Sequence, residues 1–455
     1  MEHKDGSLKS TIAVSLTNYL DAGAIVAGAS GLTLWQNYLG LTEGHLGWLN
    51  AISANCFGAA LGAIIGGFLA DKYGRKTIYT YNMLVYMFGI AIIMFTVNFP
   101  MLLVGFLITG ISVGAGVPAS WTYISENSEV GNRGRNIGLS QFAWGVGPTI
   151  ILLLGMLFAP GKADASAGVL FGYVQKIAGI FIGNDASVEA INVFSSRIIF
   201  GSLFIVAFIA WILQRKLNES KDWQEAKQAQ NKEKEPSIFA SFGTLFTNKV
   251  NIRTILFLAS IYITWNMVAG VMGFFQQHIY ETAGGLSNGE ANMISAIQWL
   301  VIIAVTYFGF AMLVDKVNQR LLYFVGTLIG IASWCILIFI GIKNIYALWA
   351  FTILWGIHAG VGVQAFYALW ASELFPAKYR AAAQGIMFFA VRSIAAVWGF
   401  GFVNIYGENG EGFSTAAYIM IGLLIFALIV GAIWTPKTQG KSLQQITKER
   451  YGEDI

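Results

Sequence analysis

Long apolar runs and short polar stretches alternate along almost the whole chain. Each run is about 20 residues long, which as a helix matches the hydrocarbon core of a bilayer. A helix also satisfies its own backbone hydrogen bonds, which lipid cannot do. The pattern therefore predicts an all-α membrane protein with twelve transmembrane helices. The predicted spans are residues 12–35, 47–70, 78–96, 100–124, 137–160, 194–215, 252–280, 291–314, 321–340, 345–372, 382–405 and 416–434.

One long polar connector interrupts this pattern at residues 216–250 and divides the predicted spans six and six. We therefore expect an N-terminal six-helix bundle over residues 1–215, a cytoplasmic linker over 216–250, and a C-terminal six-helix bundle with a cytoplasmic tail over 251–455. Composition agrees, because 56% of the 455 residues are hydrophobic and only 11% are charged. Soluble domains carry about 25% charged residues.

Lysine and arginine collect in every second connection between the predicted spans. Such connections face the cytoplasm in most membrane proteins, so we expect both termini to be cytoplasmic. The short connections favour a bacterial inner membrane. The net charge of +4 reflects this bias, and no basic face outside short loops indicates a nucleic-acid partner.

The sequence offers little for catalysis. Cys56 and Cys335 both fall inside predicted spans, where they suit neither a disulfide framework nor a metal site. A nucleotide-binding P-loop, a nucleophile–base set and a metal cluster are missing from the sequence. We therefore expect no enzymatic activity, no cofactor and no ATP-driven transport. A membrane sensor with little flux is the alternative class, which the short termini and linker disfavour.

The two halves of the chain repeat each other. Glu126 follows the fourth span and Arg133 comes seven residues later, just as Glu373 and Arg380 follow the tenth span. An acidic residue and then a basic one also follow two other spans. Asp71 and Arg75 follow the second span. Asp315 and Arg320 follow the eighth. Repeated halves are common in secondary transporters, whose substrate site lies near the midplane between them.

Residues 67–76 read Gly-Phe-Leu-Ala-Asp-Lys-Tyr-Gly-Arg-Lys, directly after the second span. This segment resembles the cytoplasmic loop signature of the major facilitator superfamily. In such a segment Gly67 permits close approach of two helices, and Asp71 caps or pairs at a helix end. The resemblance implies the two pseudo-symmetric six-helix bundles of the major facilitator fold, alternating access and a monomer in the bilayer.

Four further segments resemble the sugar-porter branch of that family. They are Ser-Glu…Arg-Gly-Arg at 125–135, Asn-Glu-Ser-Lys-Asp-Trp at 218–223, Ser-Glu-Leu-Phe-Pro-Ala-Lys-Tyr-Arg at 372–380 and Thr-Pro-Lys-Thr-Gln-Gly-Lys-Ser-Leu at 435–443. In the family, such acid–arginine clusters hold the two bundles together on the cytoplasmic side. The resemblance implies a cytoplasmic gating role for Asp71, Arg75, Glu126, Arg133, Arg135, Glu219, Asp315, Arg320, Glu373 and Arg380.

Asp21 lies in the first apolar run, where an ionisable side chain is costly and indicates function. It matches the aspartate that proton-coupled members of the family place in the first span. Those members usually carry an arginine opposite it in the fourth span, where this chain has Phe106. We predict that Asp21 is the proton-coupling carboxylate and that its protonation depends on burial; a static, hydrogen-bonded role for Asp21 is the alternative.

Arg392 is the second charge within an apolar run, at a position of the eleventh span where the family has an aromatic residue. Its guanidinium suits a carboxylate or vicinal hydroxyls of a substrate. Alternatively, Arg392 replaces the missing fourth-span arginine as the partner of Asp21, or it is structural. The paired glutamines of the family's seventh span are also absent, and Thr264 and Trp265 align there.

Polar side chains beside aromatic ones are typical of polyol and sugar sites. On this ground, and with Arg392, we predict a substrate-binding set. Interhelical hydrogen bonds are the alternative role of each amide, and His358 is either a satisfied core histidine or a proton relay. The set comprises Gln141, Trp144, Asn266, Gln298, Gln364 and Arg392.

Together these features predict a secondary active transporter of a small polyol or sugar-like solute. An inositol-type cyclitol is favoured because the sugar-porter segments are combined with binding positions that are not those of a hexose porter. Proton symport through Asp21 is the preferred energy source. The alternative is a proton-coupled carrier of an anionic organic solute, such as a sugar acid or aromatic acid, with Arg392 binding the acidic group.

Overall fold

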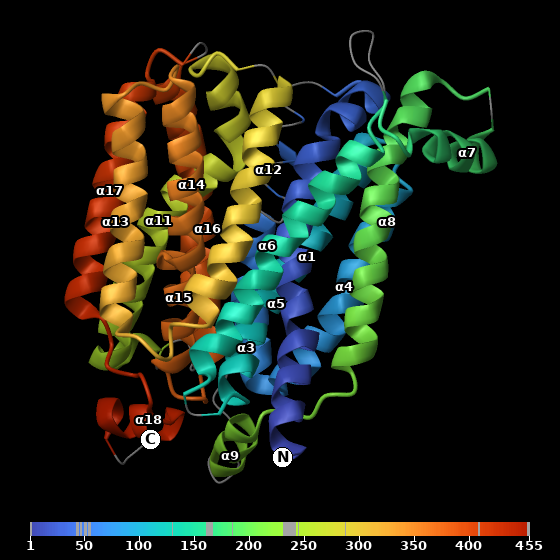
Figure 1. The fold of residues 1–455 in the computed structure, drawn as a ribbon. Helices are drawn as coiled ribbons and strands as arrows, with labels where there is room; N and C mark the ends of the chain where they lie inside the picture. The colour runs from blue at the N-terminus through green and yellow to red at the C-terminus, as the bar shows by residue number, and fades with distance from the viewer. Residues whose placement is uncertain are drawn as a thin grey trace.

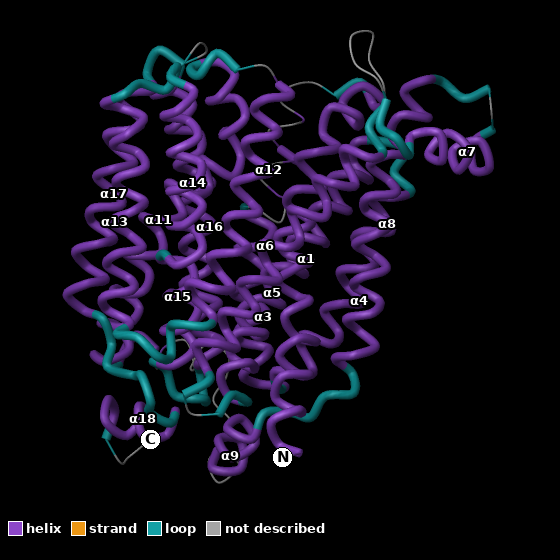
Figure 2. Tube along the Cα trace, in the orientation of Figure 1, coloured by secondary structure: helices purple, strands orange, loops and turns teal. Residues whose placement is uncertain are grey.

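The computed structural model describes residues 2–41, 45, 48–49, 52, 56–129, 131–160, 167–183, 185–230, 243, 245–286, 288–407 and 410–452. Over these ranges the chain forms helices joined by short loops, without a strand (Figure 2). Most helices run side by side along one axis (Figure 1). Both chain ends lie at the same end of this assembly, together with two short helices, α9 (Lys221–Gln230) and α18 (Leu443–Tyr451) (Figure 1).

The N-terminal half contributes six long helices. The six are α1 (Glu2–Leu39), α3 (Phe57–Tyr73), α4 (Arg75–Met94), α5 (Phe99–Glu126), α6 (Arg133–Leu157) and α8 (Val188–Gln214). Helix α1 packs against α6 and α8, and α4 packs against α5. A shorter helix, α7 (Phe171–Ile182), projects sideways at the end opposite the termini (Figure 1).

The C-terminal half contributes six helical rods, two of which are irregular. They are α11 (Lys249–Thr282), α12 (Asn288–Val305) continued by the π-helix η1 (Thr306–Ala311), α13 (Gln319–Phe339), α14 (Ile345–Val361) with α15 (Val363–Glu373), α16 (Arg380–Tyr406) and α17 (Phe413–Trp434). Within the described ranges, ten helical segments are long and apolar enough to cross a bilayer, and α1 and α3 complete the N-terminal set of six. The predicted fold class, an all-α membrane protein of twelve spans, is confirmed.

Short polar side chains explain where many of these helices begin. At six starts an asparagine or serine side chain accepts a hydrogen bond from a backbone N–H of the first turn, which has no partner inside the helix. The capping residues are Asn98, Ser187, Asn248, Asn318, Asn344 and Ser442.

Close packing between the two halves requires glycine at two positions. A Cβ atom on Gly67 of α3 would lie 2.5 Å from the carbonyl oxygen of Ala381, and one on Gly385 of α16 would lie 2.2 Å from that of Ala63. Real Cβ atoms do not approach backbone oxygens so closely. Helices α3 and α16 therefore meet backbone to backbone, as the sequence predicted for Gly67.

The boundaries differ from the sequence prediction in three places. Helix α1 runs well beyond the predicted 12–35, because its polar first turns extend past the apolar stretch. The predicted run 47–70 lies partly outside the described residues, and α3 begins at Phe57. The run 345–372 is broken at Gly362, where a Cβ atom would lie 2.2 Å from the carbonyl oxygen of His358.

Candidate functional site

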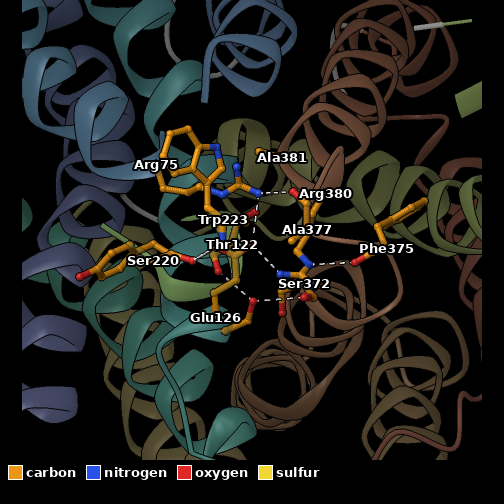
Figure 3. A network of polar contacts seen from close by, with 12 residues as sticks. Arg75, Thr122, Glu126, Ser220, Trp223, Ser372, Phe375, Ala377, Arg380 and Ala381 are labelled. Atoms are coloured by element: carbon orange, nitrogen blue, oxygen red, sulfur yellow. Dashed lines mark hydrogen bonds and ion pairs between the residues drawn. The ribbon is translucent and has the colours of Figure 1, made fainter. Parts of the chain in front are cut away.

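Glu126, at the C-terminal end of α5, is the centre of a buried cluster of charges between the two halves (Figure 3). Its Oε1 atom accepts from Arg75 Nη2 at 3.1 Å and also from Arg380 Nη1 of the other half. Its Oε2 atom accepts from the Ser220 hydroxyl. Arg75 additionally donates to the backbone carbonyl of Ala377. One carboxylate therefore joins α4 to the start of α16.

A second ion pair repeats this arrangement with the halves exchanged. Arg133 Nη1 at the start of α6 donates to Glu373 Oε1 at the end of α15, at 2.9 Å. Both side chains are buried. Arg133 also approaches the backbone carbonyl of Lys441, in the segment before α18. The C-terminal tail therefore lies against the same charged layer.

Two aspartates cap helices of the opposite half. Asp71 of α3 accepts from the backbone amides of Ala381 and Ala382 in the first turn of α16, at 3.3 and 2.7 Å. Asp315 accepts from the amides of Gly134 and Arg135 in the first turn of α6, at 3.1 and 2.7 Å. A negative charge at a helix N-terminus is favoured by the helix dipole. Asp71, Arg75, Glu126, Arg133, Asp315, Glu373 and Arg380 are called the latch below.

The remaining predicted gating residues lie at the margin of the latch. Glu219 accepts from the backbone amide of Lys76 at 3.0 Å, and burial raises the pKa of its carboxyl. Burial likewise raises the pKa of Asp315, against the lowering effect of its two backbone donors. The side chains of Arg135 and Arg320 are exposed, so the structure does not bring these two guanidinium groups into the buried cluster.

Two residues of the connector also contribute to the latch, and neither was among the predicted gating residues. Ser220 binds Glu126 as described above, and the Trp223 indole donates to the backbone carbonyl of Asp71 at 2.8 Å. Both residues lie within the segment that resembles the sugar-porter signature at 218–223. The signal was therefore present, but it carried no indication of which side chains reach the latch.

Asp21 lies deep in α1 and is only 2% exposed. Its Oδ2 atom accepts from the Trp144 indole of α6 at 3.0 Å, whereas its Oδ1 atom is buried and has no hydrogen-bond partner among the described residues. Arg392 of α16 acts on this carboxylate electrostatically from the opposite half. The two intramembrane charges singled out from the sequence are therefore neighbours across the interface of the halves.

Phe106 takes the place expected for a basic residue in the fourth span. Its ring packs on α1 so closely that a Cβ atom on Gly28 would lie 2.8 Å from it. It also meets the Phe200 ring edge to face, with centroids 6.0 Å apart. This contact is apolar on both sides, and Arg392 is the basic group whose charge acts on Asp21.

Gln141 and Trp144 lie on α6, about one helical turn apart, and Trp144 contacts Asp21. Both amide atoms of Gln141 are buried without a hydrogen-bond partner in the described part of the chain. The Trp144 ring is 5.6 Å from the Trp299 ring of the other half, between centroids. The site therefore combines unsatisfied polar atoms with aromatic surface, which is the composition of a ligand site.

On the other side of the interface, Asn266 and Gln364 share a partner. The Tyr262 hydroxyl interacts with the side chains of both amides, and Asp21 and Arg392 act on it electrostatically. Tyr262 of α11 also stacks on Tyr367 of α15, with ring centroids 3.7 Å apart. The stacking of these two tyrosines was not predicted, because two aromatic positions on different helices give no sign in the sequence that their rings meet.

Gln298 of α12 is engaged by another amide. It exchanges two hydrogen bonds with Gln276 of α11, of 3.0 and 3.2 Å, and Gln276 also donates to Ser295. Arg392 lies over the ring of Phe388, 4.8 Å from its centroid. Within the described residues no group of three or more histidine, cysteine, aspartate and glutamate side chains could hold a metal ion.

Comparison with known proteins agrees with this architecture. The sequence profile described as Major Facilitator Superfamily matches residues 11–400. The chain belongs to the Major Facilitator Superfamily. It is similar to the minor myo-inositol transporter IolF of Bacillus subtilis, with 39% identity over 98% of this chain and 94% of that protein. It is 23% identical to the major myo-inositol transporter IolT of the same organism, over 87% and 84% of the two chains.

Two solved structures have the same fold. The proton:xylose symporter XylE bound to 6-bromo-6-deoxy-D-glucose matches with a TM-score of 0.76 and 16% identity, over 98% of this chain and 99% of that one. FucP in the outward conformation matches with a TM-score of 0.72 and 15% identity, over 94% and 99%.

Proposed function

We propose that this chain is a secondary active transporter that imports a cyclitol of the myo-inositol class by alternating access, coupled to protons. The observation that carries the proposal is the set of buried, unsatisfied polar atoms at the centre: Asp21 Oδ1 and the Gln141 amide. A buried polar group without a partner costs about 1–3 kcal/mol. A solute that is covered with hydroxyl groups can satisfy such atoms while its C–H faces lie against Trp144.

Similarity to IolF supports the choice of solute, because it extends over nearly the whole of both chains. We assign substrate contacts to Gln141, Trp144, Asn266, Gln364 and Arg392. Gln298 contributes to the substrate site together with Gln276, to which its amide is hydrogen-bonded. The solute then lies between the halves, which we place at residues 1–215 and 251–455 with the linker 216–250 between them.

Alternating access requires that the two ends of the interface open in turn. The latch closes one end, and the excess of lysine and arginine in every second connection assigns that end to the cytoplasm. Both termini are then cytoplasmic, in the inner membrane of a bacterial cell. The latch residues hold the state closed to the cytoplasm, and the solute and the proton together favour their release.

Proton coupling is assigned to Asp21. Its carboxylate has one satisfied and one unsatisfied oxygen and is acted on by Arg392. Binding a proton removes the negative charge and provides an O–H donor at the unsatisfied side. An ionisable group buried inside the membrane, with a charge acting on it from the other bundle, can therefore link protonation to movement of the bundles.

The test is uptake of labelled myo-inositol into proteoliposomes with and without an inward proton gradient. We expect accumulation only with the gradient. Asp21→Asn should abolish accumulation while solute exchange survives, and Asp185→Asn, on the outer connection, is the matched control. A folded wild-type protein that takes up no myo-inositol would overturn the assigned solute.

The second candidate function is proton-coupled transport of an anionic organic solute. It is favoured by the position of Arg392 at the central interface, over Phe388. Arg392→Gln separates the two candidates. A cyclitol carrier should keep part of its uptake in this variant, whereas a carrier of sugar acids or aromatic acids should lose nearly all of it.

A further inference from the structure

His358 lies on α14 and is fully buried, and both of its ring nitrogens have partners. Its Nε2 atom accepts from the Trp265 indole of α11 at 3.2 Å. Its Nδ1 atom lies 2.9 Å from the backbone carbonyl oxygen of Gly326 on α13. Because Nε2 is an acceptor and the carbonyl can only accept, the proton is on Nδ1 and the imidazole is neutral. One ring therefore joins three helices.

The same ring fits against two glycines. A Cβ atom on Gly330 of α13 would lie 2.5 Å from the imidazole, and one on Gly362 would lie 2.9 Å from it. Gly362 is the residue at which the tenth span changes from α14 to α15. The imidazole is thus held flat against α13 on one side and touches the helix break on the other.

Both ends of this arrangement reach the central site. Trp265 is stacked with Tyr262, with ring centroids 6.1 Å apart, and Tyr262 interacts with Asn266 and Gln364. Gln364 is the second residue after the break. The direction in which α15 leaves Gly362 therefore decides where the side-chain amide of Gln364 points. Trp265 also stands where the resembling family has one of its paired glutamines.

We propose that His358 is a positioning residue, which links Trp265 to the Gly362 break and thereby places Gln364 and Asn266 for the solute. The inference deepens the proposed function, since it names what orders the C-terminal side of the same site. When Trp265 is displaced, His358 Nε2 becomes a buried acceptor without a donor, and the break loses its support. Contact of a solute with the Trp265–Tyr262 stack is then transmitted to α15.

Two pairs of variants test this. Trp265→Phe keeps an aromatic ring and removes the N–H donor, and its matched control is Trp334→Phe on α13, which removes the same atoms. Trp334 is also buried, and its indole nitrogen has no hydrogen-bond partner among the described residues. His358→Leu removes both hydrogen bonds. His358→Gln keeps a donor and an acceptor, so it should restore part of what His358→Leu loses.

The first measurement needs no solute: hydrogen–deuterium exchange of the amides at residues 358–366. We expect about 10-fold faster exchange in Trp265→Phe and His358→Leu, the factor expected for a lost buried hydrogen bond. Trp334→Phe should match the wild type, and His358→Gln should be intermediate. Equal protection in Trp265→Phe and Trp334→Phe, or no advantage of His358→Gln over His358→Leu, would overturn the proposal.

The second measurement is the concentration dependence of myo-inositol exchange. The proposal expects Trp265→Phe to raise KM about 10-fold with a smaller change in the maximal rate, whereas Trp334→Phe should leave KM unchanged even where it lowers the melting temperature. A purely structural role would leave the KM of the folded fraction unchanged in both variants. If the wild type does not transport myo-inositol, the assigned solute fails, and the exchange of residues 358–366 still decides the role of His358.

Discussion

Asp71 and Asp315 perform the same task in opposite directions. Each lies at the end of a helical rod in one half and accepts hydrogen bonds from the second and third residues of a helix in the other half, α16 for Asp71 and α6 for Asp315. Opening the latch separates each carboxylate from two backbone amides at once. The repeat of the sequence thus reappears as a repeat of contacts that cross the interface.

Removing one of these caps should favour the open latch. Asp315→Ala removes both acceptors of the Gly134 and Arg135 amides, and loss of a helix cap costs about 0.5–2 kcal/mol. We expect about 10-fold faster alkylation of a single cysteine at Ser372, which is fully buried beside the latch. The background lacks Cys56 and Cys335. An unchanged rate in both Asp315→Ala and Asp71→Ala would show that the caps do not control opening.

Loss of the Glu126 carboxylate should have a larger effect. Arg75 and Arg380 are both buried against it, and breaking a buried pair by removing one partner costs about 3–5 kcal/mol. Glu126→Gln is therefore expected to lower the melting temperature or to leave the latch open. Glu129→Gln, an exposed neighbour, should change neither. The measurement is thermal unfolding in detergent, together with alkylation at position 372.

The latch should respond to pH on the side of the membrane that carries the chain termini. Burial raises the pKa values of Asp315 and Glu219 in the closed state, and water restores their ordinary values of about 4 when the latch opens. The closed state therefore binds more protons, so the closed population should rise as the pH falls toward the raised values and decline as the pH increases. Spin-label distances across the latch measure this population. The double variant Asp315→Asn/Glu219→Gln should lose most of the response, and an undiminished response would assign it to other groups.

Gln276 and Gln298 should show strong coupling in a double-mutant cycle. Each amide satisfies the other, so Gln298→Leu alone leaves a buried amide without its main partner, which costs about 1–3 kcal/mol. Gln276→Leu/Gln298→Leu removes both amides and should recover much of that loss. Unfolding measurements of the four proteins give the coupling free energy. Additive effects would mean that the two amides act independently, which would favour a direct contact of Gln298 with solute.

The latch residues could be predicted from the sequence because they recur at fixed spacing in both halves. Glu126 and Arg133 have their counterparts in Glu373 and Arg380, and a repeated spacing of charges at helix ends predicts contacts there. The spacing did not show, however, whether a residue takes part through its side chain or through its backbone amide. At Arg135 the structure uses the backbone amide, and the guanidinium is exposed.

The central site was harder to predict from the sequence. Asp21 and Arg392 stood out because a charge inside an apolar run is costly whatever surrounds it. The Gln276–Gln298 pair, by contrast, depends on how α11 and α12 are rotated relative to each other, which one sequence does not give. The break at Gly362 looks like an ordinary apolar stretch in the sequence, because neither the extended backbone of Gly362 nor its close contact with His358 of the preceding turn leaves a sequence signal.

The ion pairs that join the two halves in the described residues, Glu126 with Arg380 and Arg133 with Glu373, all lie at the end that carries the termini. An empty carrier built in this way has a preferred resting state, in which it is closed at the end that carries the termini. Solute on that side must first wait for spontaneous rupture of these pairs before it can enter. Transport should therefore be asymmetric, and at the same solute gradient solute should leave the side of the termini more slowly than it arrives there.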